Sequence, residues 1–170
     1  MDIVADFLTA SRVVIVLYIL FVGISQGENR LLLVVALTAL AWITDVLDGA
    51  FARKSDNPTR LSRFDLVADL GLALVLSVCM ILWDLVPLLP AIIIWVIAGA
   101  AAEITHGQAP LQLAMGLVYS TLIITLLKIH PLWGWTLVLG LGFLAVINRK
   151  RVSQLVSNFL DQVADLLLKV

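Results

Sequence analysis

Apolar runs follow one another along nearly the whole 170-residue chain, separated only by short polar or proline-containing segments. Hydrophobic residues make up 62% of the sequence and charged residues 14%, which is far from the composition of a soluble domain. In lipid, a helix satisfies its own backbone hydrogen bonds, and roughly 20 apolar residues cross the hydrocarbon core. The sequence therefore predicts an all-α integral membrane protein.

Six of these runs are predicted to be transmembrane helices, all within residues 13–148. The predicted spans are 13–25, 31–51, 61–83, 87–102, 111–129 and 132–148. Residues 103–110 are expected to form a loop because they combine polar residues with glycine and proline. No segment is left over for a soluble domain, so residues 1–170 are predicted to form a single membrane domain.

Both ends of the chain carry amphipathic patterns. Apolar residues recur at helical spacing in residues 1–12 and again in residues 149–170, which predicts an interfacial helix at each end. Arg12 would lie where the chain enters the membrane, and its side chain is expected to extend to the interface. The N-terminus also carries Asp2 and Asp6 where a signal peptide would be basic, so we expect the first helix to be retained.

Basic residues predict the orientation. They gather in two places, between the second and third spans and directly after the last span: Arg53, Lys54, Arg60, Arg63, Arg149, Lys150 and Arg151. Loops rich in Lys and Arg stay in the cytoplasm, so both places are expected there. The net charge of −1 argues against nucleic acid as a partner, and a single Cys79 forms neither a disulfide nor a thiolate cluster within the chain.

Four carboxylates interrupt the second and third predicted spans. Asp45 and Asp48 are three residues apart, and Asp65 and Asp69 are four apart, so each pair lies on one helical face. An ionised Asp at the centre of a span costs about 2.5–3.5 kcal/mol, so the group needs a compensating positive charge. Hard oxygen ligands suit Mg²⁺ or Mn²⁺, and four carboxylates could hold two ions.

The surroundings of the carboxylates favour a phosphate ligand. Gly49 and Ala52 leave room for a close approach, and Arg53 offers a fork of donors to a diphosphate. Two other interpretations stay open at this point. The carboxylates could form a proton or cation pathway, or they could pair structurally with neighbouring arginines.

The residues from Asp45 to Asp69 resemble the signature of the CDP-alcohol phosphotransferase family, D-x-x-D-G-x-x-A-R followed by G-x-x-x-D-x-x-x-D. The matching positions are Asp45, Asp48, Gly49, Ala52, Arg53, Asp65 and Asp69. The segment Leu8-Thr9-Ala10-Ser11-Arg12 is similar to the L-T-x-x-R segment of many bacterial members. One departure is Leu61, which stands at the position of the second glycine, although Ser62 could replace it by a one-residue slip.

This resemblance implies a metal-dependent enzyme of phospholipid biosynthesis. It would transfer a phosphatidyl group from a CDP-alcohol such as CDP-diacylglycerol to an acceptor alcohol, with glycerol 3-phosphate favoured, and release CMP. The implied metal ligands are Asp45, Asp48, Asp65 and Asp69, with Asp69 also the general base. The implied nucleotide contacts are Asp48, Gly49, Ala52, Arg53 and Ser62, and the implied acceptor contacts are Arg149 and Arg151.

The resemblance also implies a homodimer. The basic residues and the position of the carboxylates near them predict an active site that faces the cytoplasm, in a bacterial or archaeal cell membrane. Two alternatives accompany it. A small helical cation or drug transporter would need no nucleotide, and a catalytically inactive relative would act as a membrane scaffold.

Overall fold

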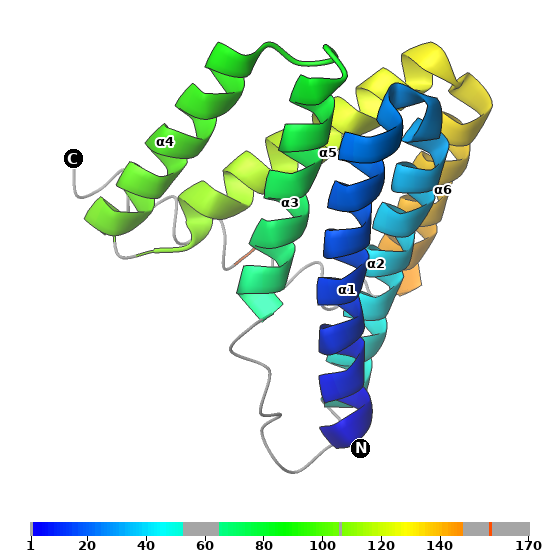
Figure 1. Ribbon diagram of the computed structural model, residues 1–170. Helices are drawn as coiled ribbons and strands as arrows, with labels where there is room; N and C mark the ends of the chain where they lie inside the picture. The colour runs from blue at the N-terminus through cyan, green and yellow to red at the C-terminus, as the bar shows by residue number, and fades with distance from the viewer. Residues whose placement is uncertain (1, 53–64, 106, 148–156, 158–170) are drawn as a thin grey trace. The chain divides into compact units, whose positions relative to one another are not determined.

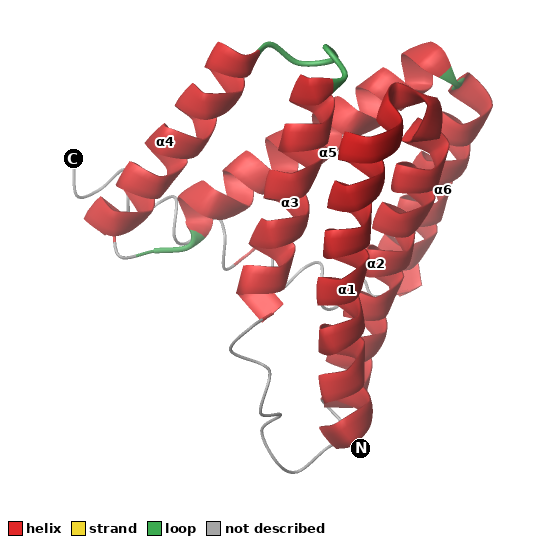
Figure 2. Cartoon of the chain, in the orientation of Figure 1, coloured by secondary structure: helices red, strands yellow, loops and turns green. Residues whose placement is uncertain are grey.

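The described part of the chain is helical throughout, with short turns and no β-strand (Figure 2). The computed structural model describes residues 2–52, 65–105, 107–147 and 157. The predicted C-terminal interfacial helix, residues 149–170, lies outside these residues apart from Ser157. The all-α prediction is confirmed for the described residues.

The described helices fall into two compact units, and the first is residues Met1–Pro87. Its elements are α1 (Asp2–Gln26), the 3-10 turn η1 (Gly27–Arg30), α2 (Leu31–Ala52) and α3 (Asp65–Leu82). The chain reverses at η1, where Gly27 adopts a φ of 63° that favours glycine. Helix α1 packs against both α2 and α3 (Figure 1), so it brings these two helices to a common centre.

The second unit is residues Leu88–Val170. Its described helices are α4 (Leu88–Thr105), α5 (Ala109–Ile129) and α6 (Pro131–Ile147). Helix α5 packs against both α4 and α6. Proline occupies the first turn of each helix, where its missing N–H leaves no hydrogen bond unmade.

The separate N-terminal interfacial helix predicted for residues 1–12 is not found. Helix α1 continues from Asp2 to Gln26 without a break at Arg12. No proline or glycine stands near Arg12 to end a helix there, and the Ser11 hydroxyl donates to the Leu8 carbonyl at 2.7 Å within the helix. The predicted interfacial helix and first span are thus one element of 25 residues.

The predicted loop of residues 103–110 is also shorter than expected. Helix α4 continues to Thr105, whose hydroxyl donates to the Ala101 carbonyl at 2.8 Å. Helix α5 already begins at Ala109, so Pro110 lies in its first turn. A proline there begins a helix and was misread as part of a loop.

Three described stretches are long and apolar enough to cross a membrane. They are Phe7–Leu47, which takes in most of α1 and of α2 with η1 between them, then Leu88–Thr105 and Ala109–Ile129. Shorter apolar stretches, Leu66–Leu82 and Pro131–Val146, make up nearly all of α3 and α6. These lengths and compositions fit an integral membrane protein, and the count of six spans stays a prediction.

Helices α1 and α3 approach each other closely at Gly23. The Trp83 indole N–H donates to the Gly23 carbonyl at 3.1 Å, and the Cys79 thiol donates to the Ile19 carbonyl at 3.9 Å. A Cβ added at Gly23 would overlap the Cys79 sulfur. Small residues at a helix contact let two backbones approach in the membrane, so Gly23 is a packing position.

We expect Gly23→Ala to destabilise the protein by about 1–3 kcal/mol, because the added methyl group overpacks the contact with Cys79. Thermal unfolding of purified protein in detergent measures the loss. Cys79→Ala removes the opposing sulfur, so the double variant should recover most of the stability. Gly99→Ala in α4 is the matched control, since nothing lies within 4 Å of its added Cβ. Equal stability of Gly23→Ala and Gly99→Ala would contradict the packing role.

Candidate active site

Three helices of the first unit each contribute one charged side chain to a common point. Nη1 of Arg12 on α1 donates to Oδ1 of Asp45 on α2 at 3.0 Å and to Oδ1 of Asp69 on α3 at 3.2 Å. A guanidinium NH₂ group carries two hydrogens, which suffices for one hydrogen bond to each carboxylate. We call Arg12, Asp45 and Asp69 the ion-pair cluster.

Burial differs sharply within the ion-pair cluster. The Arg12 side chain is 2% exposed, whereas those of Asp45 and Asp69 are 32% and 40% exposed. The positive charge therefore lies on the closed side of the cluster, and the carboxylates line its accessible side. The exposed carboxylate oxygens on the accessible side are acceptors and suit a cation or a hydrogen-bond donor.

Helical periodicity explains why these side chains meet. On α1, Arg12 shares its face with the buried Thr9 and Ile19, at offsets of three and seven residues. On α2, Asp45 follows the buried Ala41 by one turn, and on α3, Asp69 precedes the buried Ala73 by one turn. Each charged residue thus continues an apolar packing stripe of its own helix.

The prediction that Arg12 extends to the interface is wrong. Its guanidinium is buried in contact with two carboxylates, which compensate its charge. The signal was present in the sequence, since an offset of seven residues places Arg12 on the same helical face as Ile19. Reading Arg12 as a residue at the helix entry missed this pairing.

The other predicted site residues are only partly within the described residues. Asp48, Gly49 and Ala52 lie in the last turns of α2, and Asp65 begins α3, but their side chains are not described. The remaining predicted residues lie outside the described part: Arg53, Leu61, Ser62, Arg149 and Arg151. Among the described residues no group of three or more His, Cys, Asp or Glu could hold a metal, so the four-carboxylate site stays a prediction.

Asp45 and Asp69 by themselves fit a hard divalent cation. Their Oδ1 atoms contact the same nitrogen at 3.0 and 3.2 Å, so they lie no more than about 6 Å apart. Carboxylate oxygens are the ligands of Mg²⁺ and Mn²⁺, which keep several waters and need only one or two carboxylates. The pair therefore has suitable donors, and an ion between them requires only a modest approach of the two side chains.

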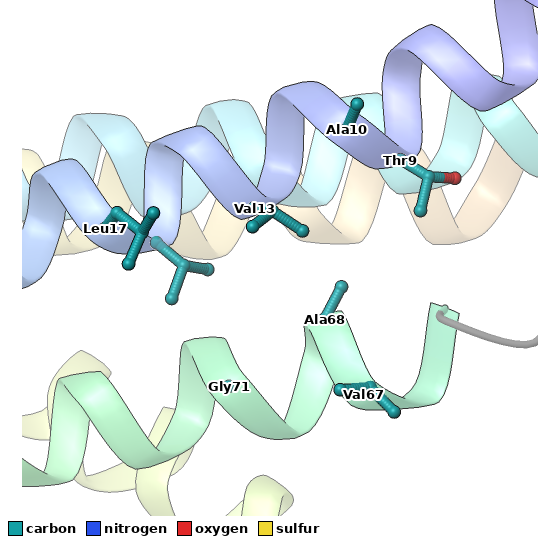
Figure 3. Close-up of a pocket in the computed structure, with 8 residues that line it drawn as sticks. Thr9, Ala10, Val13, Leu17, Val67, Ala68 and Gly71 are labelled. Carbon is teal, nitrogen blue, oxygen red and sulfur yellow. The ribbon is translucent and has the colours of Figure 1, made fainter. Parts of the chain in front are cut away.

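An apolar groove runs along α1 and α3 (Figure 3). Its volume is about 440 Å³, and it is lined by Thr9, Ala10, Val13, Val16, Leu17, Val67, Ala68 and Gly71. Figure 3 shows Thr9 and Val67 towards one end and Leu17 towards the other. Ala68 of the lining directly precedes Asp69 in sequence, so the groove and the carboxylate share one turn of α3.

A family model described as CDP-alcohol phosphatidyltransferase matches residues 2–147. This range takes in the ion-pair cluster, the groove and every described helix. No curated protein and no solved structure gave a significant match.

Proposed function

Since the chain belongs to the CDP-alcohol phosphatidyltransferase family, we propose that it transfers a phosphatidyl group from CDP-diacylglycerol to an acceptor alcohol and releases CMP. The observation that carries the proposal is the convergence of Asp45 and Asp69 from two helices on one point. Both carboxylates belong to the signature motif. Glycerol 3-phosphate is the acceptor that we propose first, because the segment that includes Thr9 and Arg12 resembles bacterial members.

The acidic residues of the motif would hold two divalent ions, Mg²⁺ or Mn²⁺. Asp45 and Asp69 have suitable oxygens within reach of one another, and we propose that Asp48 and Asp65 complete the ligand set. Such ions, when bound, neutralise the diphosphate of the donor and stabilise the CMP leaving group. The partial exposure of the Asp45 and Asp69 carboxylates supports this role.

Asp69 is proposed as the general base. Its carboxylate is 40% exposed, so an acceptor hydroxyl can reach it within hydrogen-bonding distance. Asp69 takes the proton of that hydroxyl as the acceptor oxygen forms a bond to the phosphorus that carries the diacylglycerol. The bond between this phosphorus and the bridging oxygen breaks, and CMP leaves with that oxygen.

The remaining contacts follow the motif. We propose that Gly49 and Ala52 leave space for the nucleotide beside Asp48, and that Arg53 and Ser62 bind its phosphate oxygens. Arg149 and Arg151 are proposed to bind the phosphate of the acceptor. Helical bounds support the placement, because Gly49 and Ala52 lie in the last turns of α2.

The wider setting is proposed from the same motif and from the charge pattern. Residues 1–170 would form one membrane domain with six spans, and the active site would face the cytoplasm, where the basic connections lie. Asp45 is seven residues from the end of α2 and Asp69 four from the start of α3. They therefore lie roughly 10 and 6 Å from those helix ends, near the proposed cytoplasmic surface. A homodimer in a bacterial or archaeal cell membrane completes the proposal.

The groove beside the ion-pair cluster is proposed to hold one acyl chain of the donor. Apart from the Thr9 hydroxyl its lining is apolar, and Ala68 of the lining adjoins Asp69, the proposed base. A lipid could therefore keep its chain in an apolar channel while its diphosphate lies against the carboxylates. Crosslinking of a photoactivatable lipid tail only to the opposite membrane side would contradict this arrangement.

A variant that fills the groove tests this role. Val13 lines the groove, so Val13→Trp should lower kcat/KM for long-chain CDP-diacylglycerol by about tenfold. Each buried methylene is worth about 0.8 kcal/mol, so excluding two of them suffices for that loss. Val14→Trp is the matched control, because Val14 is exposed and does not line the groove. A dihexanoyl donor should react at nearly the same rate with both variants, and an equal loss with both donors would contradict the role.

The experiment that tests the function measures CMP release by the purified protein in nanodiscs containing CDP-diacylglycerol. Candidate acceptors are added one at a time with Mg²⁺ or Mn²⁺, and lipid products are identified by mass spectrometry. We expect release that requires an acceptor and a divalent ion. Absence of release with glycerol 3-phosphate, inositol phosphate and serine would count against the enzyme.

A further inference from the structure

Arg12 lies outside the acidic motif but contacts two of the motif's carboxylates. Its Nη1 atom bridges Asp45 and Asp69 at 3.0 and 3.2 Å, the place where a cation shared by the two carboxylates would stand. Arg12 thus places a positive charge in contact with both carboxylates.

We propose that Arg12 is a positioning residue that serves as an internal counter-ion of the metal site and weakens its affinity for divalent ions. Arg12 holds Asp45 and Asp69 at one point. A divalent ion that enters from the accessible side must compete with a positive charge already paired to both ligands. The inference rests on the proposed function, since it takes Asp45 and Asp69 as metal ligands.

Burial supports the assignment of Arg12 to this role rather than to substrate binding. The Arg12 side chain is 2% exposed, and its contact with the carboxylates lies on the closed side of the cluster. A residue that gripped the donor phosphates would need to reach the accessible side. Asp45 and Asp69 reach that side, at 32% and 40% exposure, so an ion meets them before it meets Arg12.

Removing Arg12 has two opposing effects on the affinity for a divalent ion. The larger of them decides whether that affinity rises or falls. The carboxylates lose a group that holds them together, which disfavours the ion. They also lose a unit positive charge a few ångströms from the ion, which opposes binding by more than tenfold at an effective dielectric constant of about 20. The electrostatic effect is the larger, so the variant should bind metal more tightly.

The test compares Arg12→Met, Arg12→Lys and the wild type in detergent, with Mn²⁺ as the probe. Electron paramagnetic resonance measures bound and free Mn²⁺, and thermal unfolding is recorded with and without the ion. We expect Arg12→Met to bind Mn²⁺ about tenfold more tightly, to unfold at a lower temperature without metal, and to regain stability with it. Arg12→Lys retains the charge and should bind Mn²⁺ within about twofold of the wild type.

Arg30→Met is the matched control, since it makes the same change at an exposed arginine whose Nε donates to Gln26 at 2.7 Å. Its Mn²⁺ affinity should equal that of the wild type. Unchanged or weaker Mn²⁺ binding by Arg12→Met, or an equal loss of stability with and without Mn²⁺, would overturn the role of Arg12. If the wild type itself binds no Mn²⁺, the metal site and with it the proposed function are rejected instead.

Discussion

Asp69→Asn is expected to lower the rate of CMP release by about 10²–10⁴, the range that a positioned general base contributes. The amide has the size of the carboxylate but cannot take the proton of the acceptor hydroxyl. It also loses the negative charge that pairs with Arg12 at 3.2 Å. Steady-state release of CMP from CDP-diacylglycerol with a saturating acceptor measures the effect.

The control for this prediction is Asp84→Asn, the same change outside the proposed site. Asp84 lies in the turn after α3 with a φ of 54°, a conformation that asparagine tolerates as well as aspartate. Its rate should equal that of the wild type. A full rate in Asp69→Asn would exclude Asp69 as the base. Binding of CDP by the wild type without any turnover would instead identify an inactive scaffold.

Much of the fold could be predicted from the sequence, because in a membrane the apolar runs and the helices are the same segments. The predicted run 31–51 corresponds to α2, Leu31–Ala52, and the run 111–129 lies within α5. The errors occurred where local signals are ambiguous. A proline such as Pro110 ends one helix or begins the next, and only the hydrogen bonds decide which.

The break expected at Arg12 had a different cause. A charged residue between a polar and an apolar segment is typical of a membrane entry point, and that pattern is satisfied here. Burial of Arg12 depends instead on its contacts with Asp45 and Asp69, which lie 33 and 57 residues further along the chain. Periodicity assigns Arg12 to a helical face, but it does not identify which helices cover that face.

The sequence predicted the candidate site only as pairs of residues within a single helix. Spacings of three and four residues place each pair of aspartates on one face, yet they do not bring the two helices together. In the structure, helix α1 brings α2 and α3 together, because it packs against both of them and carries Arg12. The part of the site that sequence reasoning missed is therefore the part contributed by a third helix.

Asp45→Asn is expected to have the second large effect, and it should separate metal binding from proton transfer. Asp45 is proposed as a ligand only, whereas Asp69 is both ligand and base. Loss of the Asp45 charge should raise the Mn²⁺ concentration needed for half-maximal activity by about 10–100-fold or more. Substitution of residues that only orient metal ligands already lowers metal affinity by about that factor.

Excess Mn²⁺ distinguishes the two variants. At saturating Mn²⁺, Asp45→Asn should recover most of the wild-type rate, because the base is still present and only the affinity for the ion has fallen. Asp69→Asn should remain slow at every Mn²⁺ concentration, because added metal cannot replace a missing proton acceptor. Recovery of both variants to the same rate would assign Asp69 to metal binding alone, and recovery of neither would give Asp45 a part in the chemical step itself.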